Sequence, residues 1–176
     1  QASGANADFF VCGDTDATGT AEIAADFGAA GVWLWNGGGW SQLSGVNANY
    51  LIMADKNADS RGKIIGDFGP LGLWLRDTGY DWTMLSGLRQ EFMIAANLDA
   101  DPGQEVVVDF GPVGLWMYDG TYDAGNWVQL TGVNADYMIS GDFDGDLQHE
   151  LMVDFGTLGL WVYNGGAWAQ VSAANA

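Results

Sequence analysis

Residues 142–150 read Asp-Phe-Asp-Gly-Asp-Leu-Gln-His-Glu, and residues 151–156 continue with Leu-Met-Val-Asp-Phe-Gly. The first part places acidic side chains at every second position of a short loop and adds Glu150 at the ninth position. Calcium binds roughly six to eight oxygen atoms, which a tight turn can gather from alternate side chains. The stretch therefore predicts a calcium-binding loop that leads directly into a hydrophobic strand.

The same stretch occurs four times, in loops that begin at Asp14, Asp55, Asn97 and Asp142. In all four copies the Asp of Asp-Phe-Gly lies twelve positions after the loop begins, at Asp26, Asp67, Asp109 and Asp154. Short β-rich runs follow, separated by Gly, Asn and Asp, and they show no helical periodicity. Repeats of this length with four short strands each have the size of a β-propeller blade.

We therefore expect an all-β fold, a β-propeller of four repeats that forms a single domain over residues 1–176. Segments 1–10 and 170–176 both match the internal segment 129–138. The N-terminus thus resembles a strand without its blade, and the C-terminus resembles a blade that lacks its last strand. Pairing of these terminal strands would close the ring and remove exposed sheet edges. The same ends would also allow one chain to join another.

The composition excludes several classes of partner. The net charge is −18, from five Lys+Arg against 23 Asp+Glu, so the surface repels nucleic-acid phosphates and anionic lipid headgroups. No apolar run approaches the length that a bilayer-spanning helix needs, so membrane insertion is not expected. Most of the acidic residues fall in the repeated loops, and such clustering requires cations to limit self-repulsion.

Loop positions 1, 3, 5 and 9 supply the expected calcium ligands. They are Asp14, Asp16, Thr18 and Glu22; Asp55, Asn57 and Asp59; Asn97, Asp99, Asp101 and Glu105; and Asp142, Asp144, Asp146 and Glu150. Lys63 occupies the ninth position of the second loop, so that loop either binds calcium weakly or replaces the ion with a salt bridge. We expect three calcium sites and a weak fourth. The simpler alternative is a set of Asx-rich turns stabilised by side-chain to backbone hydrogen bonds.

These acidic loops, each followed by a hydrophobic strand and Asp-Phe-Gly, resemble the FG-GAP repeat family, which includes VCBS-type repeats and the integrin alpha-chain propeller. The resemblance covers essentially the whole chain and is closest in the fourth loop. It implies a calcium-stabilised β-propeller used for adhesion, ligand binding or scaffolding. Lys63 and Thr18 depart from the acidic pattern of the family.

Two other sets of residues repeat in register. The Asp of each Asp-Phe-Gly is expected to cap the turn behind it, and the alternative is convergence of all four on an axial ion. Tryptophan recurs at two strand positions, as Trp33, Trp74, Trp116 and Trp161 and as Trp40, Trp82, Trp127 and Trp168. Strict repetition favours packing between blades over contact with a glycan.

One strand position varies between the copies and holds Trp35, Arg76, Tyr118 and Tyr163. Because it is not fixed by the repeat, we expect it to be exposed and to bind a ligand. Catalytic residues are scarce: His149 is the single histidine, and it lies within the fourth acidic loop. Cys12 aligns with small or apolar residues and is expected to be a buried, inert thiol.

These observations predict a non-enzymatic, calcium-stabilised binding or adhesion module that is secreted or attached to the cell surface. Its ligand would be a protein or a glycan, because the charge excludes nucleic acid. The first alternative is a structural subunit of an extracellular fibre, in which the chain pairs with copies of itself. A carbohydrate-active enzyme is the weaker alternative, since the loops already account for the acidic residues.

Overall fold

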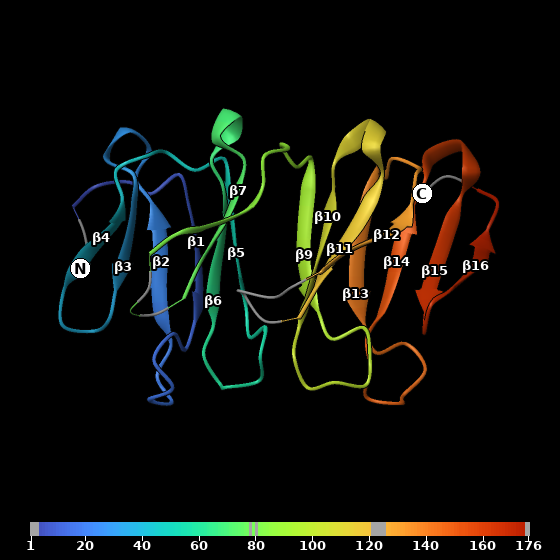
Figure 1. The fold of residues 1–176 in the computed structure, drawn as a ribbon, viewed down its shortest axis with the longest axis horizontal. Coiled ribbons are helices and arrows are strands. Elements are labelled where there is room, and N and C mark those ends of the chain that lie inside the picture. Colours follow the sequence, from blue (N-terminus) through green and yellow to red (C-terminus); the bar gives the residue numbers. More distant parts are fainter. Residues whose placement is uncertain (1–3, 78, 80, 121–125, 175–176) are drawn as a thin grey trace. The chain divides into compact units, whose positions relative to one another are not determined.

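The computed structural model describes residues 4–77, 79, 81–120 and 126–174. Within these residues the fold is all-β and consists of four antiparallel, four-stranded sheets, each with the strand order of a β-propeller blade (Figure 1). The chain divides into two compact units, one formed by residues 1–55 and 59–89 and the other by residues 56–58 and 90–176. Each unit contains two sheets. No helix among the described residues is long and apolar enough to cross a membrane.

The first unit contains two sheets whose strands follow one another in sequence order. The first sheet consists of β1 (Phe9–Gly13), β2 (Glu22–Asp26), β3 (Val32–Trp35) and β4 (Trp40–Ser44). The second consists of β5 (Tyr50–Ala54), β6 (Lys63–Asp67), β7 (Leu73–Arg76) and β8 (Thr83–Ser86). Buried residues of both sheets form one core, which includes Ala24, Val32, Leu51, Ile64 and Phe68.

The second unit repeats this arrangement. Its first sheet consists of β9 (Phe92–Ala96), β10 (Glu105–Asp109), β11 (Leu115–Asp119) and β12 (Asn126–Thr131). Its second sheet consists of β13 (Tyr137–Gly141), β14 (Glu150–Asp154), β15 (Leu160–Asn164) and β16 (Ala167–Ser172). The core between them includes Ala96, Val107, Leu115, Met138 and Leu151.

The second strand of each sheet is the most deeply buried. All five residues of β6 and of β10 are buried, because both faces of these strands are covered. That burial explains why their sequences are runs of Val, Ile and Gly between charged ends, in place of the alternating pattern of a half-exposed strand. The charged residues at both ends of these strands therefore need partners.

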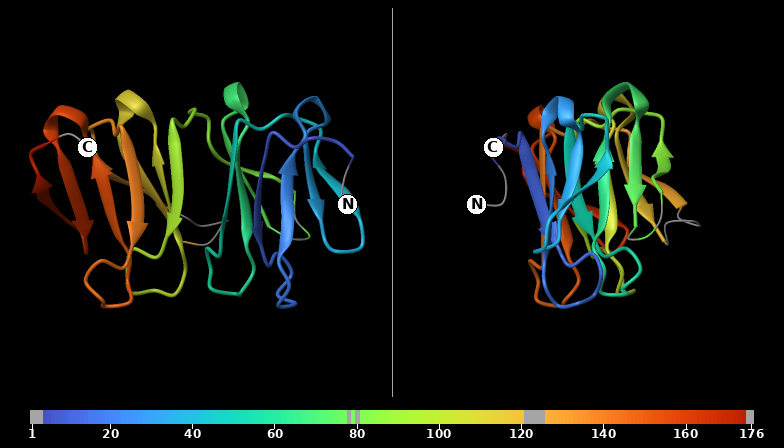
Figure 2. Two further views of the ribbon diagram at one scale, coloured as in Figure 1. Left: turned by 180° about the vertical axis from the view of Figure 1, so that it is seen from behind. Right: turned by 90° about the vertical axis from the view of Figure 1, so that its left-hand side faces the viewer.

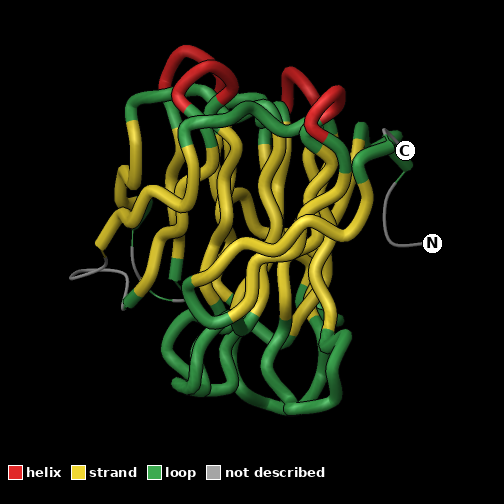
Figure 3. The backbone as a smooth tube through the Cα atoms, turned by 90° about the vertical axis from the view of Figure 1, so that its right-hand side faces the viewer, coloured by secondary structure: helices red, strands yellow, loops and turns green. Residues whose placement is uncertain are grey.

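Each sheet carries its acidic loop and its helical turn at opposite ends of the second strand. The loops join β1 to β2 and the equivalent pairs, and Figure 3 shows these loops in green and the helical turns in red. The four 3-10 turns are η1 (Gly28–Ala30), η2 (Gly69–Leu71), η3 (Gly111–Val113) and η4 (Gly156–Leu158). A glycine ends each turn for a steric reason: at Gly159, φ is +78° and a Cβ atom would lie 2.1 Å from the carbonyl oxygen of Ser172.

The predicted pairing of the N- and C-terminal strands is wrong. β1 pairs with β2 from Phe9 opposite Asp26 to Gly13 opposite Glu22, so it is the first strand of a complete sheet. β16 pairs with β15 and completes the last sheet. The physical reason is that each acidic loop joins antiparallel neighbours, so the strand before a loop belongs to the same sheet as the strand after it.

The strands before the loops also lie next to one another within each unit. Figure 2 shows β1 beside β5, and the Phe9 and Tyr50 rings of these strands are 6.5 Å apart. β9 lies beside β13 in the same way, with the Phe92 and Tyr137 rings 5.4 Å apart. Cys12 on β1 is exposed, so the expectation of a buried thiol is wrong: its strand is an edge strand of its sheet.

Candidate metal-binding loops

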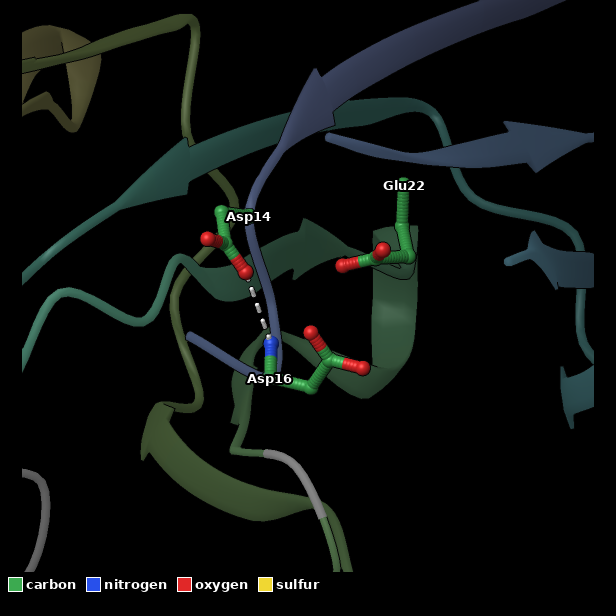
Figure 4. Close-up of side chains that lie close together, drawn as sticks. All are labelled: Asp14, Asp16 and Glu22. Atoms are coloured by element: carbon green, nitrogen blue, oxygen red, sulfur yellow. Dashed lines mark hydrogen bonds between the residues drawn. The ribbon is translucent and has the colours of Figure 1, made fainter. Parts of the chain in front are cut away.

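The first loop brings three predicted ligands together. One carboxylate oxygen from each of Asp14, Asp16 and Glu22 lies within 4.8 Å of the other two (Figure 4). Asp14 holds the loop in shape, because its Oδ1 accepts the backbone N–H of Asp16 at 3.2 Å and its Oδ2 accepts that of Gly19 at 2.6 Å. The loop can therefore offer hard oxygen donors from three directions to one cation.

The fourth loop has the same geometry at Asp142, Asp144 and Glu150. The Glu150 side chain is buried, and its Oε2 accepts the backbone N–H of Phe143 at 2.7 Å. Its Oε1 is also buried but has no hydrogen-bond partner. An unpartnered carboxylate oxygen in a buried position is costly, and a cation held with Asp142 and Asp144 would satisfy it. The fourth loop could therefore hold a metal ion.

The glutamate at position 9 has one structural role in three of the loops. It accepts the backbone N–H of the residue at position 2 at 2.6–2.7 Å, from Thr15 to Glu22, from Leu98 to Glu105 and from Phe143 to Glu150. This bond turns the carboxylate back across the loop. The sequence spacing alone did not predict this hydrogen bond. The bond explains why an acidic residue recurs seven positions after position 2.

The third loop gathers Asp99, Asp101 and Asp119, which differs from the predicted set. Burial, followed by the charges of Asp99 and Asp101, raises the pKa of Glu105 to about 7. The remaining predicted ligand is Asn97, whose Oδ1 is buried and has no hydrogen-bond partner. The loop itself therefore supplies two carboxylates of this cluster, and Asp119 at the end of β11 supplies the third.

Asp119 is a site residue that the sequence reasoning missed. The signal was present, because the equivalent positions of the four repeats hold Asn36, Asp77, Asp119 and Asn164. All four have a side-chain oxygen of the Asx type. In the fourth repeat, Asn164 reaches the acidic loop directly, since its Nδ2 donates to Oδ2 of Asp144 at 3.1 Å. In the third and fourth repeats this Asx position thus lies against the acidic loop.

The second loop holds an ammonium group among its carboxylates. Lys63 is 1% exposed, and its Nζ donates to Oδ1 of Asp59 and, at 2.9 Å, to the carbonyl oxygen of Arg61. Oδ1 of Asp55 lies 3.8 Å from the same nitrogen. Asn57, the third predicted ligand, is exposed. This geometry agrees with the alternative in which a salt bridge takes the place of the ion, so the loop does not fit a metal.

The residues at position 5 mainly stabilise the turns. Asp59, Asp101 and Asp146 each accept the backbone N–H two residues further on, at 2.7–2.9 Å. Thr18 shares a hydrogen bond with the hydroxyl of Thr20 instead. Of these four side chains, that of Asp101 alone belongs to an acidic cluster among the described residues. The Asx-turn hydrogen bonds therefore coexist with the acidic clusters and do not exclude a cation.

The prediction that the Asp of each Asp-Phe-Gly caps the turn behind it is confirmed. Asp67, Asp109 and Asp154 each accept the N–H of the glycine two residues on at 2.8–2.9 Å, and Asp26 does so at 3.3 Å. Two of them also link neighbouring sheets: Asp26 accepts the N–H of Ala48, and Asp109 accepts that of Ala135. Burial raises the pKa of both Asp26 and Asp109.

The repeated tryptophans pack mainly within their own sheets, and contacts with the neighbouring sheet, which their repetition predicted, are made by Trp82 and Trp168. Each first tryptophan donates its indole N–H to the carbonyl oxygen at the end of its own helical turn, as Trp161 does to Leu158 at 2.9 Å. Each second tryptophan contacts the Phe of its Asp-Phe-Gly, with ring centroids 5.1–5.4 Å apart. Trp82 and Trp168 also donate to Leu43 and Leu130 of the neighbouring sheet in the same unit.

The variable strand position is less exposed than expected. Tyr118 is 5% exposed and lies under the ammonium of Lys56, 4.8 Å from its ring centre, so the expectation of an exposed ring is wrong there. Tyr163 packs against Trp168 at 5.1 Å between ring centres. Trp35 and Arg76 are half-buried. The two tyrosines of this position are therefore held by packing against a tryptophan of the adjacent strand, Trp127 for Tyr118 and Trp168 for Tyr163.

Comparison with known proteins supports the fold. No protein-family model matches the chain, and no curated protein matches it. Among solved structures, the chain is similar to BBS1N in a crystal structure of its complex with ARL6DN, with a TM-score of 0.66 and 10% identity over 95% of this chain. It is also similar to the V. cholerae biofilm matrix protein Bap1, with a TM-score of 0.51 and 19% identity over 93% of this chain. The chain spans 57% of the BBS1N chain and 30% of the Bap1 chain.

Proposed function

We propose that this chain is a non-enzymatic binding module of the FG-GAP type, stabilised by calcium outside the cell, whose ligand is a protein. The observation that carries the proposal is the acidic cluster of the fourth loop, in which Oε1 of Glu150 is buried, lacks a hydrogen-bond partner and belongs to a group with Asp142 and Asp144. An array of hard oxygens with one unsatisfied buried member fits calcium.

The extracellular part of the proposal follows from the nature of these sites. Two of the three acidic members in the first and fourth loops lie at least partly in solvent, and the loops are short. Sites of this kind bind calcium weakly, and they are filled where free calcium is abundant, which is outside cells. The net charge of −18 also favours a setting rich in cations, because bound cations reduce the electrostatic repulsion between the acidic loops.

The choice of a protein ligand is supported by the structural neighbours. BBS1N was crystallised in complex with a protein, ARL6DN, and Bap1 is described as a biofilm matrix protein. The likeness to both extends over nearly all of this chain, although the low identities show only the fold. Binding surfaces on a rigid scaffold are a general use of such folds.

The calcium proposal is tested by thermal unfolding of the chain in calcium, in magnesium and in chelator. Ligand binding to the folded state raises stability, so calcium is expected to raise the unfolding midpoint by several degrees. Magnesium at the same concentration is expected to raise it less, because it requires a near-octahedral site. An unchanged midpoint between calcium and chelator would contradict the proposal.

The binding proposal is tested separately, with the chain applied in calcium to arrays of extracellular proteins and of glycans. Retention on particular proteins, lost when a chelator is added, is the expected result. Retention on glycans alone would replace the protein ligand by a carbohydrate. Absence of retention on both arrays would contradict a binding function.

A further inference from the structure

Each unit contains a small apolar pocket between its two sheets, beside a helical turn. In the second unit it is lined by Thr131, Val133, Phe155, Leu158, Trp161 and Trp168. In the first unit it is lined by Ser44, Val46, Phe68, Leu71, Trp74 and Trp82. The two sets occupy equivalent positions of the repeat, residue for residue. We call these two sites the turn pockets.

The polar groups of the turn pockets are already used within the fold. Trp161 and Trp168 donate their indole N–H groups to Leu158 and Leu130. Trp74 and Trp82 donate theirs to Leu71 and Leu43 in the same way. The pockets therefore offer aromatic and aliphatic surfaces but no indole donor for a ligand.

Each pocket has one hydroxyl group at its rim, and the hydroxyl oxygen accepts a backbone N–H of the fold. Oγ1 of Thr131 accepts the backbone N–H of Val133 at 3.2 Å, and Oγ of Ser44 accepts that of Val46 at 3.0 Å. A sugar-binding pocket combines an aromatic face with polar groups that orient the sugar hydroxyls. Beyond one hydroxyl at each rim, the lining of the turn pockets consists of aliphatic and aromatic side chains whose indole donors are already used, so it favours an apolar group over a sugar.

The size of the turn pockets limits the occupant to a side chain. Their volumes are about 180 Å³ in the second unit and about 170 Å³ in the first. Pockets for drug-sized ligands hold about 300–1,000 Å³. At their outer edge, Leu158 and Leu71 are about half exposed, so apolar surface remains in contact with water. Covering this surface with one aliphatic or aromatic side chain would be favourable.

The charge around the second pocket indicates the chemistry of the segment that carries this side chain. Asp136 is exposed and lies against η4, the turn that carries Leu158: a Cβ atom at Gly156 would lie 2.7 Å from its Oδ2. The equivalent residue in the first unit is Asn49, which lies against Gly69 of η2. A second copy of this chain would bring its own charge of −18, so like charges would oppose self-association there.

We propose that the turn pockets bind aliphatic or aromatic side chains of a positively charged polypeptide segment. This inference deepens the proposed protein-binding function and rests on it. The apolar side chain fills the space between the sheets, and neighbouring lysine or arginine residues face the acidic surface. Asp136 gives the second pocket a stronger preference for cations than the first pocket.

The probe for a direct test is the peptide acetyl-Lys-Leu-Lys-Leu-Lys-amide, titrated into the complete chain in calcium and followed by the NMR signals of the indole N–H groups. We expect the signals of Trp161, Trp168, Trp74 and Trp82 to shift. The peptides acetyl-Lys-Ser-Lys-Ser-Lys-amide and acetyl-Glu-Leu-Glu-Leu-Glu-amide are expected to cause little shift, because one lacks the apolar side chain and the other has the wrong charge.

Variants separate the pocket from the rest of the surface. Leu158→Asp is expected to weaken binding at Trp161 and Trp168 about tenfold or more, while the signals of Trp74 and Trp82 respond as before. Val171→Asp, at a similarly exposed position outside the pocket, serves as the control and is expected to change nothing. Asp136→Asn is expected to weaken binding at the second pocket about two- to fivefold and to reduce its salt dependence.

Three results would overturn the inference. The first is an equal response to the acidic or the serine peptide. The second is a shift of these indole signals by oligosaccharides such as cellohexaose but not by the basic leucine peptide. The third is no shift of these indole signals by the basic leucine peptide while the chain still binds proteins on the array. This result would contradict the pocket assignment but not the binding function. If the chain were also not retained on the protein array, both the pocket assignment and the proposed binding function would be contradicted.

Discussion

Nζ of Lys63 lies 3.8 Å from Oδ1 of Asp55, within a loop whose counterparts at Asp14 and Asp142 carry a glutamate in place of the lysine. The ammonium neutralises the carboxylates of the second loop from inside. It also opposes a metal ion at this place, because the ammonium repels a second cation close by and already contacts two of the carboxylates. In the second loop, the side-chain ammonium of Lys63 thus provides the positive charge that a bound metal ion would provide in the other loops.

The first prediction concerns the exchange of this ammonium for a carboxylate. Lys63→Glu restores the glutamate found at position 9 in the other loops, so the variant is expected to bind one more calcium ion than the parent chain. Isothermal titration gives the stoichiometry. The matched variant Lys63→Met should gain no site and should lose about 1–3 kcal/mol of unfolding free energy, because the carboxylates lose their partner. An unchanged stoichiometry for Lys63→Glu would show that the loop itself cannot hold calcium.

The second prediction ranks the loops. Asp144→Ala removes a carboxylate from the cluster of the fourth loop, whereas Asn57→Ala changes an exposed side chain of the loop that holds Lys63. We expect Asp144→Ala to abolish much of the calcium-dependent rise in the unfolding midpoint and Asn57→Ala to leave it unchanged. Thermal unfolding with and without chelator measures both. Equal losses would mean that the acidic cluster is not the calcium site.

The third prediction concerns pH. Burial raises the pKa of Glu105 to about 7 in the folded chain, above its ordinary value of 4.5. A carboxyl group with a raised folded pKa stabilises the fold fully below the unfolded pKa, and this contribution is lost as pH rises through the folded pKa. In chelator, unfolding free energy should therefore fall between about pH 4.5 and pH 7, by an order of 2–3 kcal/mol.

The control for this prediction is Glu105→Gln, which cannot ionise. In chelator its stability should vary less over the same pH interval, as measured by denaturant unfolding at each pH. A parent chain whose stability rises with pH across this interval would contradict the assignment. Calcium should reduce the loss at pH 7 in the parent, because the cation favours ionised carboxylates nearby.

The fourth prediction concerns the glycine that ends a helical turn. Gly159 and Gly166 both have positive φ, at +78° and +92°, but only Gly159 has backbone atoms where a Cβ would lie. Gly166→Ala should cost about 1–2 kcal/mol from backbone strain alone. Gly159→Ala should cost clearly more, because the chain near Ser172 must move as well. Similar costs for both variants, measured by denaturant unfolding, would refute this steric explanation.

Much of the fold could be predicted from the sequence because the repeat fixes it. The acidic loop, the Asp-Phe-Gly turn and the two tryptophans each occur four times. This repetition predicted the number of sheets and the turn-capping role of Asp26, Asp67, Asp109 and Asp154. The assignment of strands to sheets was harder. A periodic sequence does not show where one sheet ends, and only the pairing of β1 with β2 places the boundary after β4.

The candidate site was predicted less completely, for reasons of local geometry. Asp119 joins the third loop from the end of β11, far from the loop in sequence, so loop spacing could not include it. Position 5 was expected to bind metal, but Asp146 there accepts the backbone N–H of Gln148 and lies outside the acidic cluster of its loop. Tyr118 is covered by Lys56, a residue of the preceding loop, which no comparison of aligned positions reveals.

The backbone N–H of His149 donates to the carbonyl oxygen of Asn97 at 2.6 Å, and Gly62 donates to Asp14 in the equivalent place of the first unit. Each bond joins position 8 of one loop to position 1 of the loop before it. The His149 amide thus lies at the junction of two acidic loops, so its hydrogen exchange depends on the order of both. One amide signal therefore reports on a pair of loops that are far apart in the sequence.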